Sequence, residues 1–122
     1  MVIRPVKRTD ILALCGQSYA QSLRGLAIEH DGEPVGLAGV LHTNPLQCFS
    51  EMTDRLRESP KTIVKTAIQL RDILDSYAAD IYAIASEEEP TASRFLEYVG
   101  FKYINSTHQG ELYQWQRRSP IY

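Results

Sequence analysis

The chain has 122 residues, of which 43% are hydrophobic and 23% charged, with a formal net charge of −2 and a sequence pI near 5.9. This length supports one hydrophobic core and is short for two domains, so we expect a single domain over residues 1–122. The charge balance argues against DNA or RNA as a partner, because surfaces that bind nucleic acids usually carry a clear basic excess.

No membrane or secretory segment is expected either. The longest mainly apolar stretch, residues 34–41, is far shorter than a bilayer span and contains two glycines. The N-terminal residues turn polar at Lys7, too early for a signal peptide. Cys15 and Cys48 lie in separate apolar contexts, which favours buried free thiols over a disulfide or a metal pair. These features predict a protein made in a reducing, cytosolic compartment.

The first half of the chain predicts a strand, a helix and an antiparallel meander. Thr9 or Asp10 can cap the helix, because either side chain can accept a hydrogen bond from the first helical turn. Asp31-Gly32 separates two apolar runs and predicts a tight hairpin, since such a turn requires positive φ. The apolar runs of this half predict strands at residues 2–6, 26–30, 35–41 and 46–50.

The second half predicts two helices and three strands. Ser59-Pro60 marks a sharp helix start, with serine as the N-cap and proline at the first helical position, and helical spacing continues to Tyr77. A second helix begins at Pro90 and ends at Gly100. Strands are predicted at residues 80–85, 101–105 and 111–116. The order β-α-β-β-β-α-β-α-β-β indicates an α/β fold around a mixed sheet.

Three segments of this sequence resemble the GNAT (N-acetyltransferase-like) superfamily. They are Ile3-Arg4-Pro5 followed by Thr9-Asp10-Ile11, the hairpin sequence Glu33-Pro34-Val35-Gly36, and the helix sequence Ala92-Ser93-Arg94-Phe95-Leu96-Glu97-Tyr98-Val99-Gly100-Phe101. The likeness covers nearly the whole chain, and its most specific part is the helix that ends in Gly-Phe. It implies a GNAT-like mixed, mostly antiparallel sheet with flanking helices.

A closer resemblance is to the short acetyltransferase-like proteins of tailed phages, which include internal virion proteins of short-tailed phages. Residues 49–53 are followed here by residues 56–61 and then by the helix positions Lys65 and Arg71. The resemblance implies a phage protein located in the host cytoplasm or incorporated in the virion. Its implied partners are other virion proteins or a host protein.

The segment expected to hold the cofactor departs from the superfamily pattern. In working GNAT enzymes this loop has the pattern Gln/Arg-x-x-Gly-x-Gly/Ala, whose glycines let backbone N–H groups approach the coenzyme A pyrophosphate. Residues 55–60 contain no glycine. Arg55, Arg57, Ser59 and Lys61 remain as candidate pyrophosphate contacts, and the alternative is a solvated helix start. We therefore expect no cofactor, or acetyl-CoA if these side chains replace the glycine loop.

The candidate general acid is also displaced. Many GNAT enzymes protonate the leaving thiolate with a tyrosine that follows an aliphatic residue. That tyrosine lies in the helix that corresponds here to residues 90–100. Leu96 occupies that position here. Tyr98 lies about 200° further around the helix and could act only in a shifted register. Pro90 stands where an asparagine is expected.

Glu51, at the end of a core strand, is the candidate general base, and a plain surface carboxylate is the alternative. The three histidines are scattered and form no metal-ligand spacing, so no metal is expected.

These features predict a degenerate GNAT-fold phage protein that acts as a non-catalytic structural or binding component of the virion or its assembly. One alternative is a coenzyme A-dependent N-acyltransferase with an atypical phosphate loop, and another is a small regulator that binds a host protein. The C-terminal residues 117–122 place two arginines before Ile121 and Tyr122, a composition that suits either docking onto a partner chain, including a homo-oligomer, or folding back on the domain.

Overall fold

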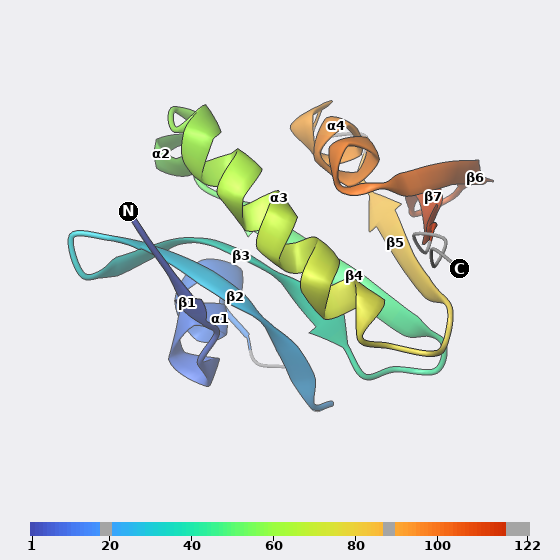
Figure 1. Ribbon diagram of the computed structural model, residues 1–122, viewed down its shortest axis with the longest axis horizontal. Helices are drawn as coiled ribbons and strands as arrows, with labels where there is room; N and C mark the ends of the chain where they lie inside the picture. Colours follow the sequence, from blue (N-terminus) through green and yellow to red (C-terminus); the bar gives the residue numbers. More distant parts are fainter. Residues whose placement is uncertain (18–20, 87–89, 117–122) are drawn as a thin grey trace, which may run out of the picture.

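The computed structural model describes residues 1–17, 21–86 and 90–116, which form a single sheet with helices on both faces (Figure 1). The elements are β1 (Val2–Pro5), α1 (Arg8–Cys15), β2 (Leu23–His30), β3 (Glu33–Leu41), β4 (Leu46–Met52), α2 (Asp54–Arg57), α3 (Pro60–Asp75), β5 (Ile81–Ala85), α4 (Pro90–Val99), β6 (Phe101–Thr107) and β7 (Gly110–Trp115). The seven strands lie in the order β1-β2-β3-β4-β5-β7-β6, and every neighbouring pair is antiparallel except β4 and β5. The predicted mixed, mostly antiparallel sheet is confirmed.

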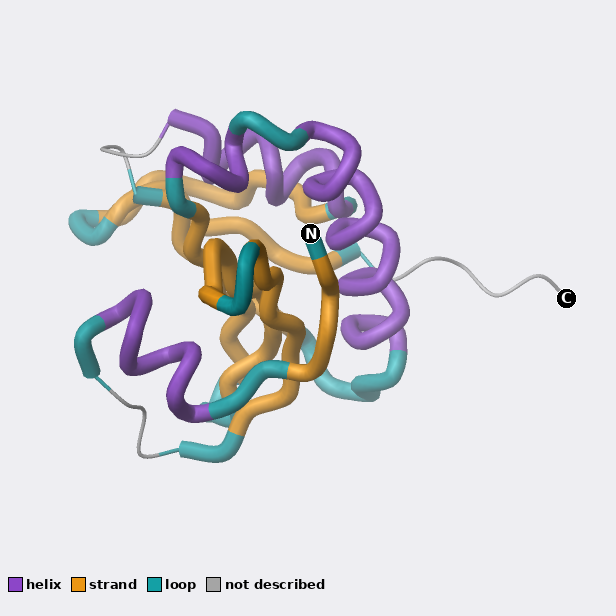
Figure 2. Tube along the Cα trace, turned by 90° about the vertical axis from the view of Figure 1, so that its left-hand side faces the viewer, coloured by secondary structure: helices purple, strands orange, loops and turns teal. Residues whose placement is uncertain are grey.

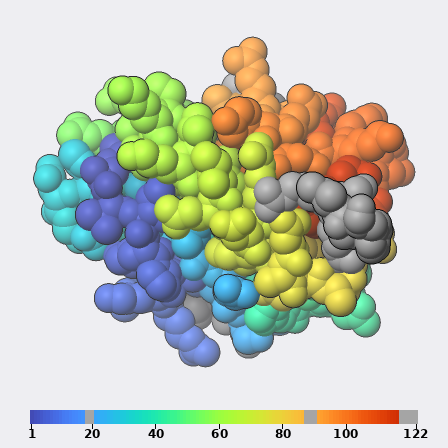
Figure 3. Space-filling model, in the orientation of Figure 1, coloured from blue at the N-terminus to red at the C-terminus, as the bar shows by residue number. Residues whose placement is uncertain are grey.

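The helices divide unequally between the two faces of the sheet. Helix α1 packs on one face, against β2 and β3, whereas α2, α3 and α4 lie on the other (Figure 2). Figure 3 looks onto this second face, where α3 (yellow-green) runs between the N-terminal strand (dark blue) and α4 (orange). No helix in the described ranges has both the length and the apolar composition needed to cross a bilayer.

The β2–β3 hairpin forms where the sequence predicts it. Asp31 and Gly32 have φ values of 52° and 82°, as the tight turn requires. Further along the same pair, Gly25 lies opposite Gly39. A Cβ at Gly39 would come within 2.5 Å of the Arg24 carbonyl oxygen, so the strands approach more closely there than a side chain would allow.

Helix α1 starts earlier than predicted, and neither Thr9 nor Asp10 is its cap. Lys7 occupies the N-cap position, and Asp10 lies one turn inside, where its buried carboxylate accepts a hydrogen bond from the Lys7 N–H at 2.8 Å. The Arg4 guanidinium donates to the two oxygens of that carboxylate at 2.7 and 2.8 Å. These hydrogen bonds from Arg4 lower the pKa of Asp10. The early start fits this pairing, because it places Asp10 where Arg4 can reach it.

Helix α3 forms the centre of the main core. Ser59 is its N-cap residue and Pro60 its first helical residue, as predicted. Its inward stripe of apolar side chains is buried against the sheet and consists of Ala67, Leu70, Ile73 and Leu74. Arg71 joins it to α4, because its guanidinium donates to the carbonyl oxygens of Val99 at 2.8 Å and Tyr98 at 2.5 Å.

Among the elements of the described residues, helix α2 is the one that was not predicted from the sequence. Its four residues follow the N-cap Thr53, whose hydroxyl accepts a hydrogen bond from the Leu56 N–H. Leu56 is 2% exposed and packs in a small core with Ile28 and Val35. The turn is therefore fixed by the long-range burial of one leucine, which local periodicity does not reveal.

Candidate functional site

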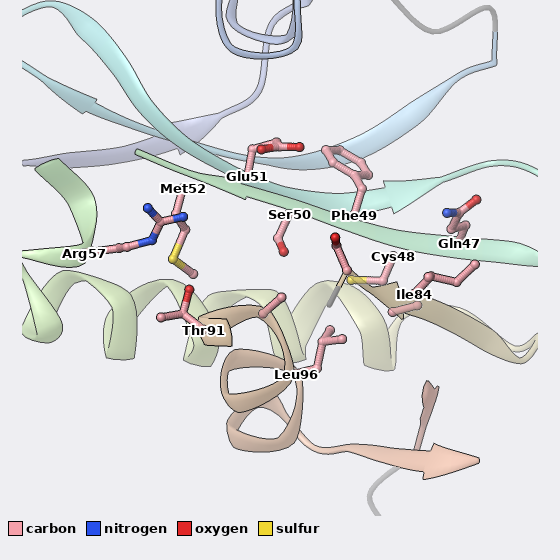
Figure 4. Close-up of a pocket in the computed structure, with 13 residues that line it drawn as sticks. Gln47, Cys48, Phe49, Ser50, Glu51, Met52, Arg57, Ile84, Thr91 and Leu96 are labelled. Atoms are coloured by element: carbon pink, nitrogen blue, oxygen red, sulfur yellow. The ribbon is translucent and has the colours of Figure 1, made fainter. Parts of the chain in front are cut away.

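The candidate site is a cavity of about 430 Å³ at the point where β4 and β5 separate. The two strands are paired at only two positions, Leu46 with Ile81 and Gln47 with Tyr82, and diverge beyond them. Helix α4 contributes a third wall through Thr91, Ala92 and Leu96 (Figure 4). The remaining lining residues are Gln47, Cys48, Phe49, Ser50, Glu51, Met52, Arg57, Ala83, Ile84 and Ser86.

Side chains along β4 point alternately to the two faces of the sheet, so β4 lines the cavity with different residues on each face. Glu51 lies opposite Leu37 of β3, which is buried on the α1 face, so Glu51 points to that face. Ser50 and Met52 therefore point to the opposite face, and Figure 4 shows them on the other side of the strand from Glu51. Cys48 shares their face and is buried, and burial raises the pKa of its thiol to about 12. The Cys48 thiol is consequently an uncharged part of the wall at neutral pH.

Only one of the four predicted pyrophosphate contacts lines the cavity. Arg57 does so, and its Nη1 donates to Asp54 Oδ1 at 2.6 Å. Arg55 extends instead to the β2–β3 hairpin, where its Nη2 lies 2.6 Å from His30 Nε2. Ser59 Oγ lies 2.8 Å from Thr62 Oγ1, and Lys61 is an exposed residue outside the cavity lining. The structure thus separates these four side chains rather than gathering them around one anion.

The backbone between β4 and α3 is engaged in its own hydrogen bonds. N–H groups of this segment donate to carbonyl oxygens of the same segment at 2.9–3.2 Å. The pairs are Leu56 and Arg57 to Thr53, Glu58 to Asp54, Ser59 to Leu56, and Thr62 and Ile63 to Ser59. Pro60 has no N–H. A phosphate-binding loop needs such donors directed at its ligand. Here six of them are used within the segment, and the N–H groups of Asp54, Arg55 and Lys61 are not among those six.

Tyr98, the candidate acid, lies outside the cavity. Its ring is half-exposed on α4, and the Arg71 guanidinium carbon lies 5.4 Å from the ring centroid. Leu96, two residues earlier, lines the cavity together with Thr91 and Ala92 of the same helix. The helix register therefore directs Leu96, and not Tyr98, to the cavity.

Glu51, the candidate base, does line the cavity, and its side chain is exposed. Two hydroxyl groups that were not predicted from the sequence also line the cavity, those of Ser50 and Thr91. Strand alternation from Glu51 would have placed Ser50 on the inner wall, whereas Thr91 gives no signal until α4 is known to pack there.

The predicted C-terminal docking segment, residues 117–122, lies outside the described residues. Within the described ranges, no group of three or more histidine, cysteine, aspartate or glutamate residues could hold a metal ion.

Comparison of the sequence with protein-family models and with curated proteins gives no match. Comparison of the structure with solved structures gives several. An acetyltransferase from Agrobacterium tumefaciens superposes with a TM-score of 0.60 at 12% identity, over 88% of this chain and 67% of that one. A variant of the spermidine N-acetyltransferase SpeG from Vibrio cholerae gives the same TM-score and identity, over 93% and 92% of the two chains. The chain has the GNAT fold.

The aminoglycoside acetyltransferase AAC(6′)-Ib, solved in complex with coenzyme A, gives a TM-score of 0.53 at 18% identity, over 88% of this chain and 70% of that one. Similarity at these identities establishes the GNAT fold alone, because one fold hosts many functions. The activity of this GNAT-fold chain must therefore be argued from its own site.

Proposed function

We propose that this GNAT-fold chain is a non-catalytic binding or structural component that works without coenzyme A. The observation that carries the proposal is helix α2. It occupies the connection between β4 and α3, and six backbone N–H groups of this connection and the first turn of α3 donate to the chain's own carbonyl oxygens instead of being directed at a ligand.

The charges of this connection support the same conclusion. Arg57 is the predicted cation that lines the cavity, and it is already paired with Asp54 at 2.6 Å. Glu58 adds an exposed negative charge beside it. Placing a pyrophosphate beside Arg57 would bring it near the carboxylates of Asp54 and Glu58, which opposes binding, and the other predicted cations, Arg55 and Lys61, do not line the cavity. These charges support the proposal that the chain works without acetyl-CoA.

The resemblance to short phage proteins gives the proposal its biological setting. We place the chain in the virion or its assembly, with a host protein as the alternative partner. Mass spectrometry of purified particles distinguishes a virion component from a chain that binds a host protein. A fixed number of copies per particle is expected for a virion component, whereas absence from particles together with recovery of a host protein in pull-downs would indicate a regulator.

The direct test of the proposal is calorimetric titration of the purified chain with acetyl-CoA, supported by a thermal-shift scan. We expect no heat and no shift at millimolar ligand. Saturable binding in the micromolar range, roughly −8 kcal/mol, would refute the proposal. If binding occurs, Arg57→Gln should weaken it and Arg55→Gln should not, because only Arg57 lines the cavity.

A second candidate function, N-acyl transfer, is favoured by the cavity itself. It lies where β4 and β5 diverge and is lined by Glu51, a carboxylate that could accept a proton from an amine. Spermidine and ribostamycin are the acceptors to test first, because structurally similar proteins are a spermidine N-acetyltransferase and an aminoglycoside acetyltransferase solved with ribostamycin. Acetyl transfer that falls with Glu51→Gln would support this function, and a rate equal to the protein-free rate would exclude it for these acceptors.

A further inference from the structure

We infer that the gap between β4 and β5 accepts an extended peptide from a partner protein as an added strand. The inference rests on the proposed function, since an acyl-CoA in the same gap would leave no room for a peptide. The supporting evidence is the direction of the backbone groups, the chemistry of the walls and the length of the gap.

The backbone of β4 presents hydrogen-bonding groups to this gap. The Thr53 N–H donates to the Val35 carbonyl at 3.0 Å, which identifies the register of bonding between β3 and β4. Alternation then directs the backbone groups of Glu51 toward β3 and those of Ser50 and Met52 away from it. Cys48 follows the same alternation, and the last β4–β5 pair, Gln47 with Tyr82, uses the Cys48 N–H as a parallel ladder requires. Ser50 and Met52 lie beyond that pair, so in the described part of the chain the β4–β5 ladder does not reach their backbone groups.

The opposite edge of the gap belongs to β5. Its pairing with β4 ends at Tyr82, whereas its pairing with β7 continues through Ala85. Backbone groups two residues apart in a strand point to the same side, so those of Ile84 face the gap as those of Tyr82 face β4. A chain inserted here would find strand edges on both sides, which is the arrangement that binding by strand addition uses.

The walls specify the side chains that such a peptide would carry. On the α4 face the floor is formed by Cys48, Ala83 and Leu96, which suits small apolar side chains. On the other face Glu51 is exposed, and it has no ion pair among the described residues. A lysine or arginine at the outward positions would complement that charge. The predicted ligand alternates small apolar with polar or basic residues.

The length of the gap sets the length of the peptide. The part of β4 beyond its ladder with β5 runs from Phe49 to Met52. At about 3.3 Å per residue this edge is about 13 Å long and matches about four residues of an extended peptide. A cavity of about 430 Å³ is at the small end of ligand pockets, in keeping with a short strand whose outward side chains remain in solvent.

The experiment is selection of displayed random peptides of about seven residues against the wild-type chain, followed by affinity measurement on two variants. Ser50→Pro removes the N–H that faces the gap and leaves the β3–β4 hydrogen bonds in place, because Ser50 and Ala38 form a non-hydrogen-bonded pair of that ladder. Ser50→Ala removes the same hydroxyl, keeps that N–H and is the matched control. We expect selected peptides to bind Ser50→Pro about tenfold or more weakly than Ser50→Ala.

Circular dichroism and a thermal melt establish whether Ser50→Pro is folded. If it is not, selected peptides with alternate backbone amides N-methylated replace it, since they remove the same hydrogen bonds from the ligand side. Glu51→Gln should weaken peptides that carry a basic residue and spare those that do not.

Failure to select any peptide, or equal affinity for both Ser50 variants, would overturn the inference. Self-association that Ser50→Pro abolishes would also overturn it, because a second copy would then be the occupant. Acetyl-CoA binding is measured separately and tests the proposed function. The two failures are therefore distinguishable.

Discussion

Replacement of Leu56 by alanine tests whether α2 is a fixed part of the fold. Leu56 is 2% exposed and packs against Ile28 and Val35, and a Cβ added at Gly36 would overlap its side chain. The leucine therefore holds the turn against β2 and β3, and its truncation would leave a cavity that a four-residue helix can fill only in part.

The expected loss is about 3 kcal/mol in the free energy of unfolding, within the range for truncating a buried leucine and below its upper end because α2 lies at the edge of the core. For a domain of this size such a loss lowers Tm by roughly 12 °C. Amide exchange at Arg57, Glu58 and Ser59 should also accelerate more than exchange in the middle of α3, because the intrahelical hydrogen bonds of α2 would open locally.

Urea unfolding followed by circular dichroism gives the free energy, and hydrogen exchange followed by mass spectrometry or NMR gives the local effect. Leu12→Ala is the control, since Leu12 is 55% exposed and its loss should change stability by less than about 0.5 kcal/mol. A loss below about 1 kcal/mol at Leu56, or unchanged exchange at residues 57–59, would show that α2 is not anchored and would remove the main support for the proposed function.

Three further predictions concern the frame around the site. Asp10→Asn should destabilise the fold by about 2 kcal/mol at neutral pH, because it removes the carboxylate that pairs with Arg4. Since the pKa of Asp10 is lowered in the folded state, the extra stability of wild type over Asp10→Asn should be lost as the pH falls from about 5 through that pKa. Urea unfolding of both proteins across this pH range should show their free energies of unfolding converge. Arg71→Met should lower the free energy of unfolding by about 1–2 kcal/mol and accelerate amide exchange in α4, because two carbonyl groups of α4 lose their donor. Amide exchange equal to that of wild type would show that Arg71 does not hold α4 to α3. Gly39→Ala should lower the free energy of unfolding by about 1–3 kcal/mol, since its Cβ would meet backbone, and an unchanged Tm would refute that contact.

Local signals explain most of what the sequence predicted correctly. Asp31-Gly32 predicts its hairpin because the turn requires positive φ, and Pro60 predicts the start of α3 because proline is accommodated at a first helical position. The GNAT-like order of elements follows from these signals and from the resemblance of the helix that ends at Gly100-Phe101.

The site was less predictable because it depends on contacts between distant residues. Residues 55–60 lack glycine, which the sequence makes plain, but nothing local indicates that Leu56 is buried and that its segment folds into a helix. The cavity itself depends on how far the β4–β5 pairing extends, which is a matter of tertiary packing. Glu51 was predicted near the end of a core strand and lies one residue before the end of β4, whereas its role as a base stays a prediction.

The short β4–β5 junction has a mechanical consequence. Two residue pairs and the contacts between α3 and α4 connect a half that contains β1 to β4 with a half that contains β5 to β7. A pulling force applied between the first and last described strands has to cross that junction, where few hydrogen bonds share the load. The junction is therefore where we expect the sheet to tear first, so that the two halves separate before either one unravels.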